Sequence, residues 1–524
     1  QRNAFEQLLQ ERGLNTLQGG RFMHVLGNCD KGRASQQLKC FYTCSNTTVK
    51  TIVIGDSPND AAMLSMADIS VMINSPSNKA LQTLLVPHIR TRQEAPDGWA
   101  EAIEKALLTT RGALMSDFFQ NGRITTLHNL HNRSLQKMED DLRYFSRQRP
   151  MGLILPSLYS ELQRPALDTI IKELKKVDYL QQIVIGIDQA SKAEFKHALR
   201  FFSDLPQAHD LLWNDGPNLM AIDKKLRKMG LAPTEKGKGR NVWYCMGYML
   251  AKGNTKAVAL HDCDIITYER GMLARLLYPI ANPQFKYQFC KGYYPRVADN
   301  SMNGRVSRLL VTPLVRALNQ QIGSHDDLEF LDSFRYPLAG EFSMRHEVME
   351  SLRMPTDWGL EVGILMEMRK NYSTSQLCQV DIADQYDHKH QELSAEDKQQ
   401  GLSKMSIEIS KAIFKKLATD GINFTEESLR TTKATYYRIA LDLVDSYLSD
   451  AIFNGLDYEI HEEEMMVEMF AENIKHAGRL FLADSDKAPV IPSWNRVSSA
   501  IPDIFSQLLD AVEADHKALG QRIS

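Results

Sequence analysis

A chain of 524 residues is too long for one compact core, so its length predicts two or three domains. Hydrophobic residues make up 43% and charged residues 24%, as in an ordinary globular protein. The net charge of −3 argues against a dedicated nucleic-acid binder, because such proteins carry a basic excess. A small anionic substrate is still compatible with this composition, since it needs only a local cluster of Arg and Lys.

The sequence shows no sign of a membrane partner. No run reaches the roughly 18 apolar residues that cross a bilayer, and residues 1–3 lack the layout of a signal peptide. Seven cysteines are scattered without a C-x-x-C pair, which favours reduced thiols and a cytoplasmic location. Because the chain opens without Met and in helix-like sequence at residues 4–9, we also expect further sequence upstream.

The N-terminal part divides into two stretches. Residues 1–110 alternate short β-rich runs with helical runs, and residues 51–54 (TIVI) predict a buried strand that ends in a loop. Residues 111–147 are polar and helical in composition, so we expect a helical linker there.

A second α/β pattern covers residues 148–395. Its apolar runs predict buried strands at residues 152–156, 182–188 and 257–260, with a helix at residues 165–176. Apolar strands separated by helices are typical of a mostly parallel sheet that is covered on both faces.

The last stretch, residues 396–524, has no strand pattern. Its apolar and aromatic residues recur at three- and four-residue spacing, as Tyr436, Ile439, Leu443 and Tyr447 do. We expect helices that pack on the catalytic sheet or form a homodimer interface.

Residues 55–60 (GDSPND) come directly after the strand predicted at 51–54. Asp56 and Asp60 are four residues apart on the loop leaving the sheet, where carboxylate oxygens can hold Mg²⁺. Upstream, Lys31 in the segment DKG is a cation for a phosphoryl group. A turn that caps a helix is the alternative, because Asp, Ser and Asn are common capping residues.

The segments DKG (30–32) and GDSPNDAAML (55–64) resemble the last two motifs of haloacid-dehalogenase-type phosphatases, in the branch of mannosyl-3-phosphoglycerate phosphatase. The resemblance implies that Lys31 contacts phosphate and that Asp56, Asn59 and Asp60 surround Mg²⁺. The family's nucleophile lies in an N-terminal D-x-D-G-T motif, which this sequence lacks. This partial domain is therefore a relic, or the expected upstream sequence carries the nucleophile.

Asp262 and Asp264 (DCD) follow the strand predicted at 257–260. An acid-x-acid pair can hold a divalent ion against a diphosphate, and the ion offsets the charge of the leaving group. This spacing alone arises by chance in many chains, but its neighbours favour a site. Asp188 ends an earlier strand, and residues 236–240 (KGKGR) form a basic segment for phosphate or a solvated turn.

An ordered set of segments across residues 155–388 resembles glucosyl-3-phosphoglycerate synthase and its mannosyl counterpart. The segments are LPSLYSE (155–161), GKG (237–239), DCD (262–264), GRVS (304–307), PLAGEF (337–342), GLEVG (359–363) and QVD (379–381), followed by His388. The resemblance implies an α/β chain with a GT-A nucleotide-diphospho-sugar transferase fold, a Rossmann-like mixed sheet. That domain would follow an N-terminal partial haloacid-dehalogenase-like α/β domain and precede a C-terminal helical extension.

The family moves a hexose from GDP-mannose or UDP-glucose to the 2-hydroxyl of 3-phosphoglycerate, with retention and with Mg²⁺ or Mn²⁺ as cofactor. For this chain the resemblance implies the same transfer, in the synthesis of mannosylglycerate or glucosylglycerate as compatible solutes. The sequence leaves the donor open between glucose and mannose.

The resemblance also assigns residues to the donor. The side chains expected around the nucleotide and the sugar are those of Pro156, Leu158, Glu161, Asp188, Lys238, Asp262 and Trp358. Glu361 would accept hydrogen bonds from the sugar hydroxyls and act in catalysis, and Trp358 would flank the sugar opposite it.

Acceptor and metal are assigned in the same way. The residues expected to bind phosphoglycerate are Gly304, Arg305, Val306, Ser307 and His390. Asp264 and His388 would bind the metal, His388 being preferred over His390 although the stretch 387–390 aligns only with a one-residue shift. The leaving diphosphate would accept the acceptor's proton, while the main-chain carbonyl of Leu338 orients the hydroxyl.

Three interpretations compete. The first is the 3-phosphoglycerate transferase, extended to a bifunctional synthase and phosphatase if upstream sequence carries the nucleophile. The second is a transferase of the same fold with a polyprenyl phosphate or glycan acceptor, against which the GRVS motif weighs. The third is a non-catalytic fusion of binding modules, which Asp264, His388 and Arg305 disfavour.

Overall fold

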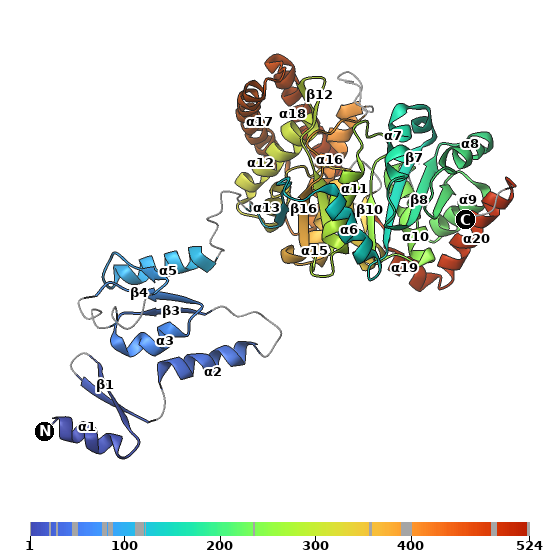
Figure 1. The fold of residues 1–524 in the computed structure, drawn as a ribbon. Helices are drawn as coiled ribbons and strands as arrows, with labels where there is room; N and C mark the ends of the chain where they lie inside the picture. Colours follow the sequence, from blue (N-terminus) through green and yellow to red (C-terminus); the bar gives the residue numbers. More distant parts are fainter. Residues whose placement is uncertain are drawn as a thin grey trace. The chain divides into compact units, whose positions relative to one another are not determined.

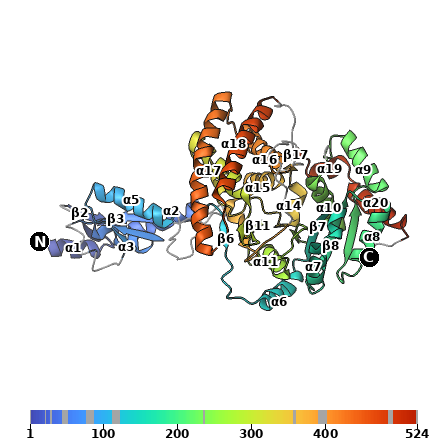
Figure 2. The same cartoon turned by 90° about the horizontal axis from the view of Figure 1, so that it is seen from above.

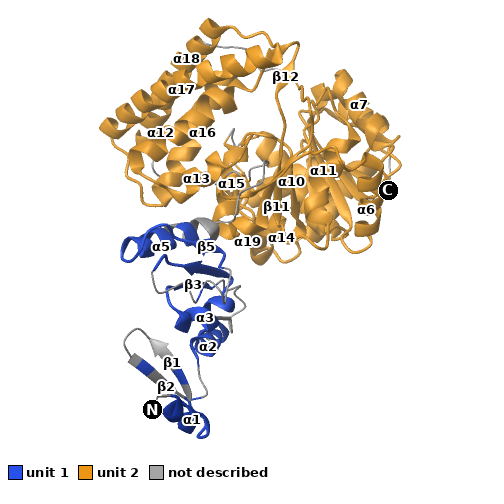
Figure 3. Ribbon diagram, turned by 60° about the vertical axis from the view of Figure 1, so that its left-hand side comes forward, with its two compact units in different colours: residues 1–119 blue, residues 120–524 orange. Residues whose placement is uncertain are grey.

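The structure, a computed structural model, describes residues 2–19, 22–27, 30–43, 51–75, 81, 87–110, 120, 122–233, 236–355, 359–388, 401–483 and 490–520. The chain forms two compact units, Gln1–Phe119 and Gln120–Ser524 (Figures 1 and 3). None of the helices in the described ranges combines the length and apolar character needed to cross a bilayer.

The smaller unit is built on a parallel sheet of three strands in the order β3-β4-β5. The strands are β3 (Ile52–Gly55), β4 (Ile69–Met72) and β5 (Ile89–Arg90), so the strand predicted at 51–54 is confirmed. Successive residues of β4 point to opposite faces: Val71 packs in one apolar cluster and Met72 in another.

The other elements of the smaller unit surround this sheet or precede it. They are α1 (Arg2–Gln10), β1 (Asn15–Gly19), β2 (Phe22–Leu26), α2 (Lys31–Thr43), η1 (Pro58–Asp60), α3 (Ala61–Ser65) and α5 (Asp97–Thr110). Strands β1 and β2 pair with each other in antiparallel fashion, apart from the three-stranded sheet.

The larger unit is built on an eight-stranded sheet in the order β6-β16-β11-β14-β10-β7-β8-β9. The strands are β6 (Thr125–Leu127), β7 (Met151–Leu158), β8 (Leu180–Asp188), β9 (His209–Trp213), β10 (Ala257–Leu260), β11 (Phe289–Tyr293), β14 (Phe342–Arg345) and β16 (Leu377–Asp381). Neighbouring strands are parallel except at β14, which is antiparallel to both β10 and β11. The strands predicted at 152–156, 182–188 and 257–260 are confirmed as β7, β8 and β10, and the predicted mixed α/β sheet with them.

Helices cover both faces of this sheet because its strands are apolar on both sides. In β7, Leu153 and Leu155 pack in one core cluster while Ile154 packs in the other. The first cluster lies under α6 (Leu135–Ser146), α7 (Pro165–Leu174), α8 (Lys192–Phe202) and α11 (Arg270–Ala281). The helix predicted at 165–176 is confirmed as α7.

The opposite face carries the second core cluster and most of the remaining elements. They are α9 (Pro217–Lys228), α10 (Lys238–Lys252), η4 (Val306–Val311), α12 (Thr312–Ile322), α13 (Asp326–Asp332), α14 (His346–Ser351), α15 (Leu360–Asn371), and the C-terminal helices. Short elements complete the unit: η3 (Tyr159–Gln163), β12 (Val297–Ala298), β13 (Ser301–Met302), β15 (Met354–Pro355), η5 (Thr374–Gln376) and β17 (Val490–Ile491).

The C-terminal helices form two groups at opposite ends of the sheet (Figures 1 and 2). The first group is α16 (Gly401–Thr419), α17 (Glu426–Asn454) and α18 (Ile460–Ala483), which pack on one another and on α12 and η4. The second group is α19 (Trp494–Ala500) and α20 (Ile504–Lys517), which lie beside α9 and α10. The predicted helical region is confirmed except at the two-residue strand β17, which pairs with β15, and its helices share the core cluster of the sheet.

The second group fixes the helices that follow β9 and precede β10. Asp515 of α20 accepts hydrogen bonds from the backbone N–H groups of Asn218 and Leu219, at 3.1 and 3.2 Å, at the start of α9. Trp494 stacks on Trp243 of α10 with ring centroids 4.1 Å apart and donates to its carbonyl at 2.9 Å. Residues remote in sequence therefore hold α10, whose first residue is Lys238.

Residues 122–147 belong to the larger unit. We predicted a helical linker at residues 111–147, of which 111–119 and 121 lie outside the described residues. The described remainder contributes β6, which pairs with β16 at the sheet edge, and α6, which packs on α11. The polar composition of this stretch reflects an edge strand and a one-sided helix, both of which keep one surface in water.

Replacing Trp494 tests whether α19 stabilises the larger unit. We expect Trp494→Ala to lower the free energy of unfolding by about 3–5 kcal/mol, because a buried indole and its stacking partner lose their contacts. Urea denaturation followed by circular dichroism measures the change. The matched control is Trp99→Ala, because Trp99 is 43% exposed and lies in the other unit. An unchanged midpoint for Trp494→Ala would show that α19 does not stabilise this unit.

Candidate active site

Lys238, at the start of α10, joins two carboxylates. Its Nζ lies 2.8 Å from Oδ1 of Asp262, in the loop after β10, and 3.2 Å from Oε1 of Glu361, at the start of α15. Burial opposes the charge on the amine, but Asp262 and Glu361 raise the pKa of Lys238 well above its ordinary value. Lys238 therefore remains a cation, and it holds both acids at the carboxyl edge of the sheet.

Asp262 lies close to two other acids, Glu341 and Asp264, and to the backbone of Gly340. Burial raises the pKa of Asp262 to about 6, with Lys238 opposing and the charges of Glu341 and Asp264 adding to the rise. Gly340 lies directly against this carboxylate, since a Cβ at position 340 would be 2.1 Å from Oδ2 of Asp262. The glycine of the segment PLAGEF is therefore needed for the close approach of this loop to Asp262.

Asp264 faces His388, as predicted for a pair of metal ligands. Nδ1 of His388 is 3.6 Å from Oδ2 of Asp264, and this buried atom has no hydrogen-bond partner within 3.5 Å among the described residues. An isolated bridge between Ile265 and His388 fixes the two loops side by side. Burial works to raise the pKa of Asp264, but His388 and Lys238 hold it below its ordinary value.

This pair fits a divalent cation that takes further ligands from a substrate. An ion about 2.1 Å from each donor would reach both atoms, because they are only 3.6 Å apart. Within the described ranges no cluster of three or more His, Cys, Asp or Glu side chains is placed to hold an ion. Two protein ligands suit Mg²⁺ or Mn²⁺ shared with a diphosphate.

Arg296, in the loop after β11, makes a short contact through Nη1 with Nε2 of His388. The guanidinium is always a donor, so Nε2 accepts here and the ring hydrogen belongs on Nδ1. Metal binding at Nδ1 needs the hydrogen on Nε2, and Arg296 would then have to give up this contact. Arg296 was not predicted from the sequence, where its signal is its position in the segment KGYYPR (291–296), just after a strand.

Glu341 is a fully buried acid behind Asp262. Tyr294 donates its hydroxyl to Oε2 at 2.7 Å, and Tyr386 donates to Oε1 at 2.6 Å. The two tyrosine rings stack with centroids 3.6 Å apart. Burial works to raise the pKa of Glu341, but His261 and the two hydroxyl donors hold it below its ordinary value.

A cavity of about 520 Å³ joins these groups to the segment GRVS. Of the residues proposed from sequence, it is lined by Lys238, Asp262, Gly304, Arg305, Val306, Leu338, Glu361 and His388. Residues that the sequence analysis did not single out also line it, among them Arg296 and Tyr336. Residues predicted for the donor, the metal and the acceptor, separated by up to 150 positions, thus line one cavity.

The segment GRVS begins with a left-handed turn. Gly304 has φ +78°, a conformation that residues with a Cβ rarely adopt, and the chain then enters η4. Arg305 lines the cavity, whereas Ser307 is buried and its Oγ has no hydrogen-bond partner among the described residues. Ser307 does not cap this helix, because η4 begins at Val306 and its N-cap residue is Arg305, which makes no side-chain cap.

The residues predicted for the nucleotide gather at the ends of β7 and β8. Leu158 is the register partner of Asp188, and Pro156 lies two residues earlier on β7. Burial raises the pKa of Asp188 to about 6, against a hydrogen bond from Asn214 and the charge of Arg240. Glu161 lies buried in η3, 3.8 Å from Arg164. None of these four residues lines the cavity described above.

Two predicted residues, Trp358 and His390, lie outside the described residues. Of the two histidines considered as metal ligands, the structure describes only His388, which faces Asp264.

The smaller unit brings its predicted residues together. Nζ of Lys31 lies 2.7 Å from Oδ1 of Asp60, whose Oδ2 accepts from the backbone of Asp56 and from Ser57. Burial works to raise the pKa of Asp60, but Lys31 and Ser57 hold it below its ordinary value. Asn59 lies beside them in η1, where its buried Oδ1 has no hydrogen-bond partner among the described residues. Ser57 and Asp60 form a capping box, so the capping alternative also describes this turn.

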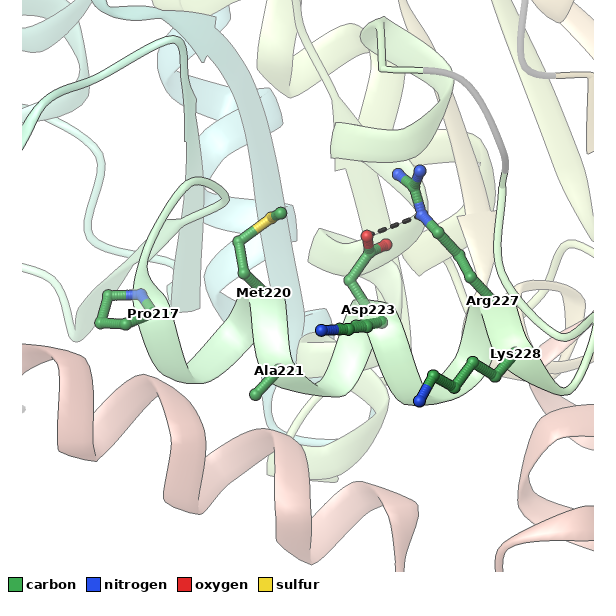
Figure 4. A pocket seen from close by; sticks show the side chains of 7 residues that line it. Pro217, Met220, Ala221, Asp223, Arg227 and Lys228 are labelled. Atoms are coloured by element: carbon green, nitrogen blue, oxygen red, sulfur yellow. Dashed lines mark ion pairs between the residues drawn. The ribbon is translucent and has the colours of Figure 1, made fainter.

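A second hollow, of about 630 Å³, lies on α9 and is open to solvent (Figure 4). Its acid, Asp223, already pairs with Arg227 at 2.7 Å and with Arg240 at 3.3 Å, and it accepts from Tyr244 at 2.7 Å. The charge of Asp223 is therefore compensated by the two arginines, so this carboxylate is not available to act on a substrate.

Removing one hydroxyl donor from Glu341 tests how tightly this buried acid is held. We expect Tyr386→Phe to lower the free energy of unfolding by about 1.5–3 kcal/mol, because a buried carboxylate loses a charge-assisted hydrogen bond. Thermal and urea denaturation measure it. Tyr144→Phe is the control, because Tyr144 is 59% exposed. Equal stability of the two variants would contradict the hydrogen-bonded role of Tyr386.

Comparisons with known proteins identify relatives of both parts of the chain. A sequence model described as haloacid dehalogenase-like hydrolase matches residues 3–103. Over 98 residues the chain is 37% identical to a glucosyl-3-phosphoglycerate/mannosyl-3-phosphoglycerate phosphatase from Methanococcoides burtonii, a match covering 18% of this chain and 36% of that protein. The N-terminal resemblance to these phosphatases is confirmed, over about a third of the phosphatase.

The longer match is to a transferase. The chain is 42% identical over 402 residues to glucosyl-3-phosphoglycerate synthase from Persephonella marina, covering 77% of this chain and 99% of that enzyme. A solved structure of glucosyl-3-phosphoglycerate synthase from Mycobacterium tuberculosis, in complex with Mn²⁺, UDP-glucose and phosphoglyceric acid, aligns with a TM-score of 0.43 and 18% identity, covering 58% of this chain and 90% of that one. Because the match to the Persephonella marina enzyme extends over nearly its whole length, the chain belongs to the glucosyl-3-phosphoglycerate synthase family of glycosyltransferases.

Proposed function

We propose that the chain transfers glucose from UDP-glucose to the 2-hydroxyl of 3-phosphoglycerate, with retention at the sugar carbon. The observation that carries this proposal is the single cavity lined by Lys238, Asp262 and Glu361 at one end and by Gly304 and Arg305 at the other. One end suits a sugar diphosphate and the other suits a small phosphorylated acid. The name of the Persephonella marina relative supports glucose as the sugar.

The metal would be held by Asp264 and His388. When bound, Mg²⁺ or Mn²⁺ supplies positive charge that stabilises the departing diphosphate. Lys238 adds a permanent cation on the same side, because its pKa is raised by the two acids beside it. The half-buried Asp262 would then face the nucleotide, while Glu361 accepts hydrogen bonds from the sugar hydroxyls.

Retention at the sugar carbon is implied by membership of the glucosyl-3-phosphoglycerate synthase family. It can arise through a covalent intermediate on a protein carboxylate or through front-face attack. The carboxylates that line the cavity near the sugar end, Asp262 and Glu361, are both bound to Lys238. We therefore assign the front-face route: the bond from the sugar carbon to the diphosphate breaks as the acceptor oxygen attacks from the same side. The leaving diphosphate takes the proton of the acceptor hydroxyl, and the main-chain carbonyl of Leu338 orients that hydroxyl.

Arg305 would bind the phosphate of the acceptor. A guanidinium and the N–H groups at the start of η4 can form several charge-assisted hydrogen bonds with one phosphate. Ser307, whose Oγ has no hydrogen-bond partner among the described residues, lies in the same helix. A product that carries both a sugar and a phosphate would serve as precursor of a glycosylglycerate, a compatible solute.

The smaller unit supports a second, narrower proposal: binding of a phosphorylated ligand by Lys31, Asp56 and Asp60. The contact of Lys31 with Asp60 places a cation beside the acids that would surround Mg²⁺. With an aspartyl nucleophile in a longer chain, this unit would remove the phosphate that the transferase leaves on its product. Release of inorganic phosphate from glucosyl-3-phosphoglycerate by such a chain tests this.

The transfer is tested with purified full chain, 3-phosphoglycerate, and UDP-glucose or GDP-mannose, each with Mg²⁺ or Mn²⁺. We expect glucosyl-3-phosphoglycerate from UDP-glucose, and loss of product when EDTA removes the metal, detected by mass spectrometry. A product from GDP-mannose alone would overturn the assignment of glucose. The absence of product from both donors would overturn the proposed function.

Replacement of Asp264 tests the metal site. We expect Asp264→Ala to lower the transfer rate by at least about 100-fold, because it removes one of two protein ligands. The same variant would weaken Mn²⁺ binding, which is measured without turnover by electron paramagnetic resonance. Asp204→Ala is the control, because the Asp204 side chain is 70% exposed on the surface. Unchanged Mn²⁺ binding in Asp264→Ala would remove Asp264 from the metal site.

A further inference from the structure

Arg305 is held from behind by helix α18. Its Nε donates to Oε1 of Glu463 at 2.6 Å, and its Nη2 donates to Oε2 of Glu462 at 3.1 Å. Both acids lie in the first turn of α18, more than 150 positions further along the chain. The two bonds occupy one edge of the guanidinium and leave Nη1 on the opposite side. These two bonds thus fix the plane of the Arg305 guanidinium where the residue lines the cavity.

Glu463 and Glu462 differ in their burial. The side chain of Glu463 is 2% exposed, whereas that of Glu462 is 57% exposed. Glu463 also pairs with Arg308, through Oε2, at 2.9 Å. A surface pair such as that of Glu462 contributes little and is screened by salt, but a buried carboxylate shared by two arginines has few alternative positions.

Arg308 is itself fixed to the loop that precedes Gly304. It donates to the carbonyls of Asn303 at 2.9 Å and Met302 at 3.1 Å, and its guanidinium lies 4.7 Å from the ring centroid of Tyr447. Glu463 therefore connects the cavity residue Arg305 to a network that holds the same turn. Acidic residues also stabilise a helix N-terminus, but that effect needs neither burial nor a bridge between two arginines.

The neighbouring helix α16 forms part of the cavity wall. Leu402, Met405 and Ile409 of α16 line the same cavity as Arg305 and Gly304. These residues sit one turn apart along one face of the helix. The C-terminal helices thus belong to the surroundings of the acceptor end of the cavity.

We propose that Glu463 is a positioning residue for acceptor binding: it fixes one edge of Arg305 so that the other edge is presented to the acceptor's phosphate. The proposal rests on the proposed function, and it assigns the start of α18 to the support of the acceptor site. Glu463 does not touch the substrate. It acts through Arg305 by reducing the conformations that the guanidinium would otherwise lose on binding.

The test is steady-state kinetics of Glu463→Gln in the full chain, with each substrate varied in turn. We expect the KM for 3-phosphoglycerate to rise about tenfold, because a neutral amide holds the guanidinium less firmly. The KM for UDP-glucose and the kcat would stay within about twofold of the wild type. Glu463→Asp, which keeps the charge but withdraws it from Arg305, would raise the same KM if the amide variant does not fold.

The matched control is Glu139→Gln. Glu139 is also a buried acid, with a side chain 4% exposed, and pairs with Arg270 at 2.9 Å between α6 and α11. It does not line the cavity. A similar loss of melting temperature in both variants, with a raised KM for 3-phosphoglycerate only in Glu463→Gln, separates positioning from general stability.

A double-mutant cycle with Arg305→Gln completes the test. If Glu463 acts through Arg305, the double variant has the same KM for 3-phosphoglycerate as Arg305→Gln alone. Three outcomes would overturn this inference only. The first is additive effects of the two substitutions on the KM for 3-phosphoglycerate, and the second is an equal rise in the KM for UDP-glucose. The third is an unchanged KM for 3-phosphoglycerate in Glu463→Gln when Arg305→Gln raises it. Normal acceptor kinetics in Arg305→Gln, or a wild type without transfer, would overturn the proposed acceptor site and this inference with it.

Discussion

The ion pairs of Lys238 with Asp262 and Glu361 are the interaction on which the site in the larger unit depends. The amine of Lys238, at the start of α10, contacts Asp262 in the loop after β10 and Glu361 at the start of α15. These three elements are far apart in sequence. Asp262 in turn lies against Gly340, and Glu341 behind it is kept ionised by Tyr294 and Tyr386. Acids this close would repel one another without a shared cation, so Lys238 holds Asp262 and Glu361 near each other.

The C-terminal helices support this edge from two sides. Trp494 stacks on Trp243 in the helix that begins with Lys238, and Asp515 caps the preceding helix α9. At the other end of the sheet, α18 contacts Arg305 and α16 lines the cavity. The described helices of this region thus pack around the site and share one apolar core with the sheet.

Much of the site could be predicted from local sequence because strands and their ends are local features. The apolar runs at 152–156, 182–188 and 257–260 became β7, β8 and β10, and the acids at their ends lie at one edge of the sheet. Arg296, Tyr294 and Tyr386 were missed for the opposite reason. Their importance comes from partners on other strands, such as His388 and Glu341, and no spacing within their own segments shows it.

The sequence by itself determined the mixed α/β class, the order of its strands along the chain, the acid-x-acid pair and the segment GRVS. These depend on side-chain period, turn residues and short motifs, which are written into a few consecutive positions. Only the tertiary structure decided that Lys238 binds both Asp262 and Glu361, and that Glu463 of a distant helix holds Arg305. Pairings of this kind are set by how packed helices and a sheet edge bring charges together, and a buried charge must find its partner wherever the fold places one.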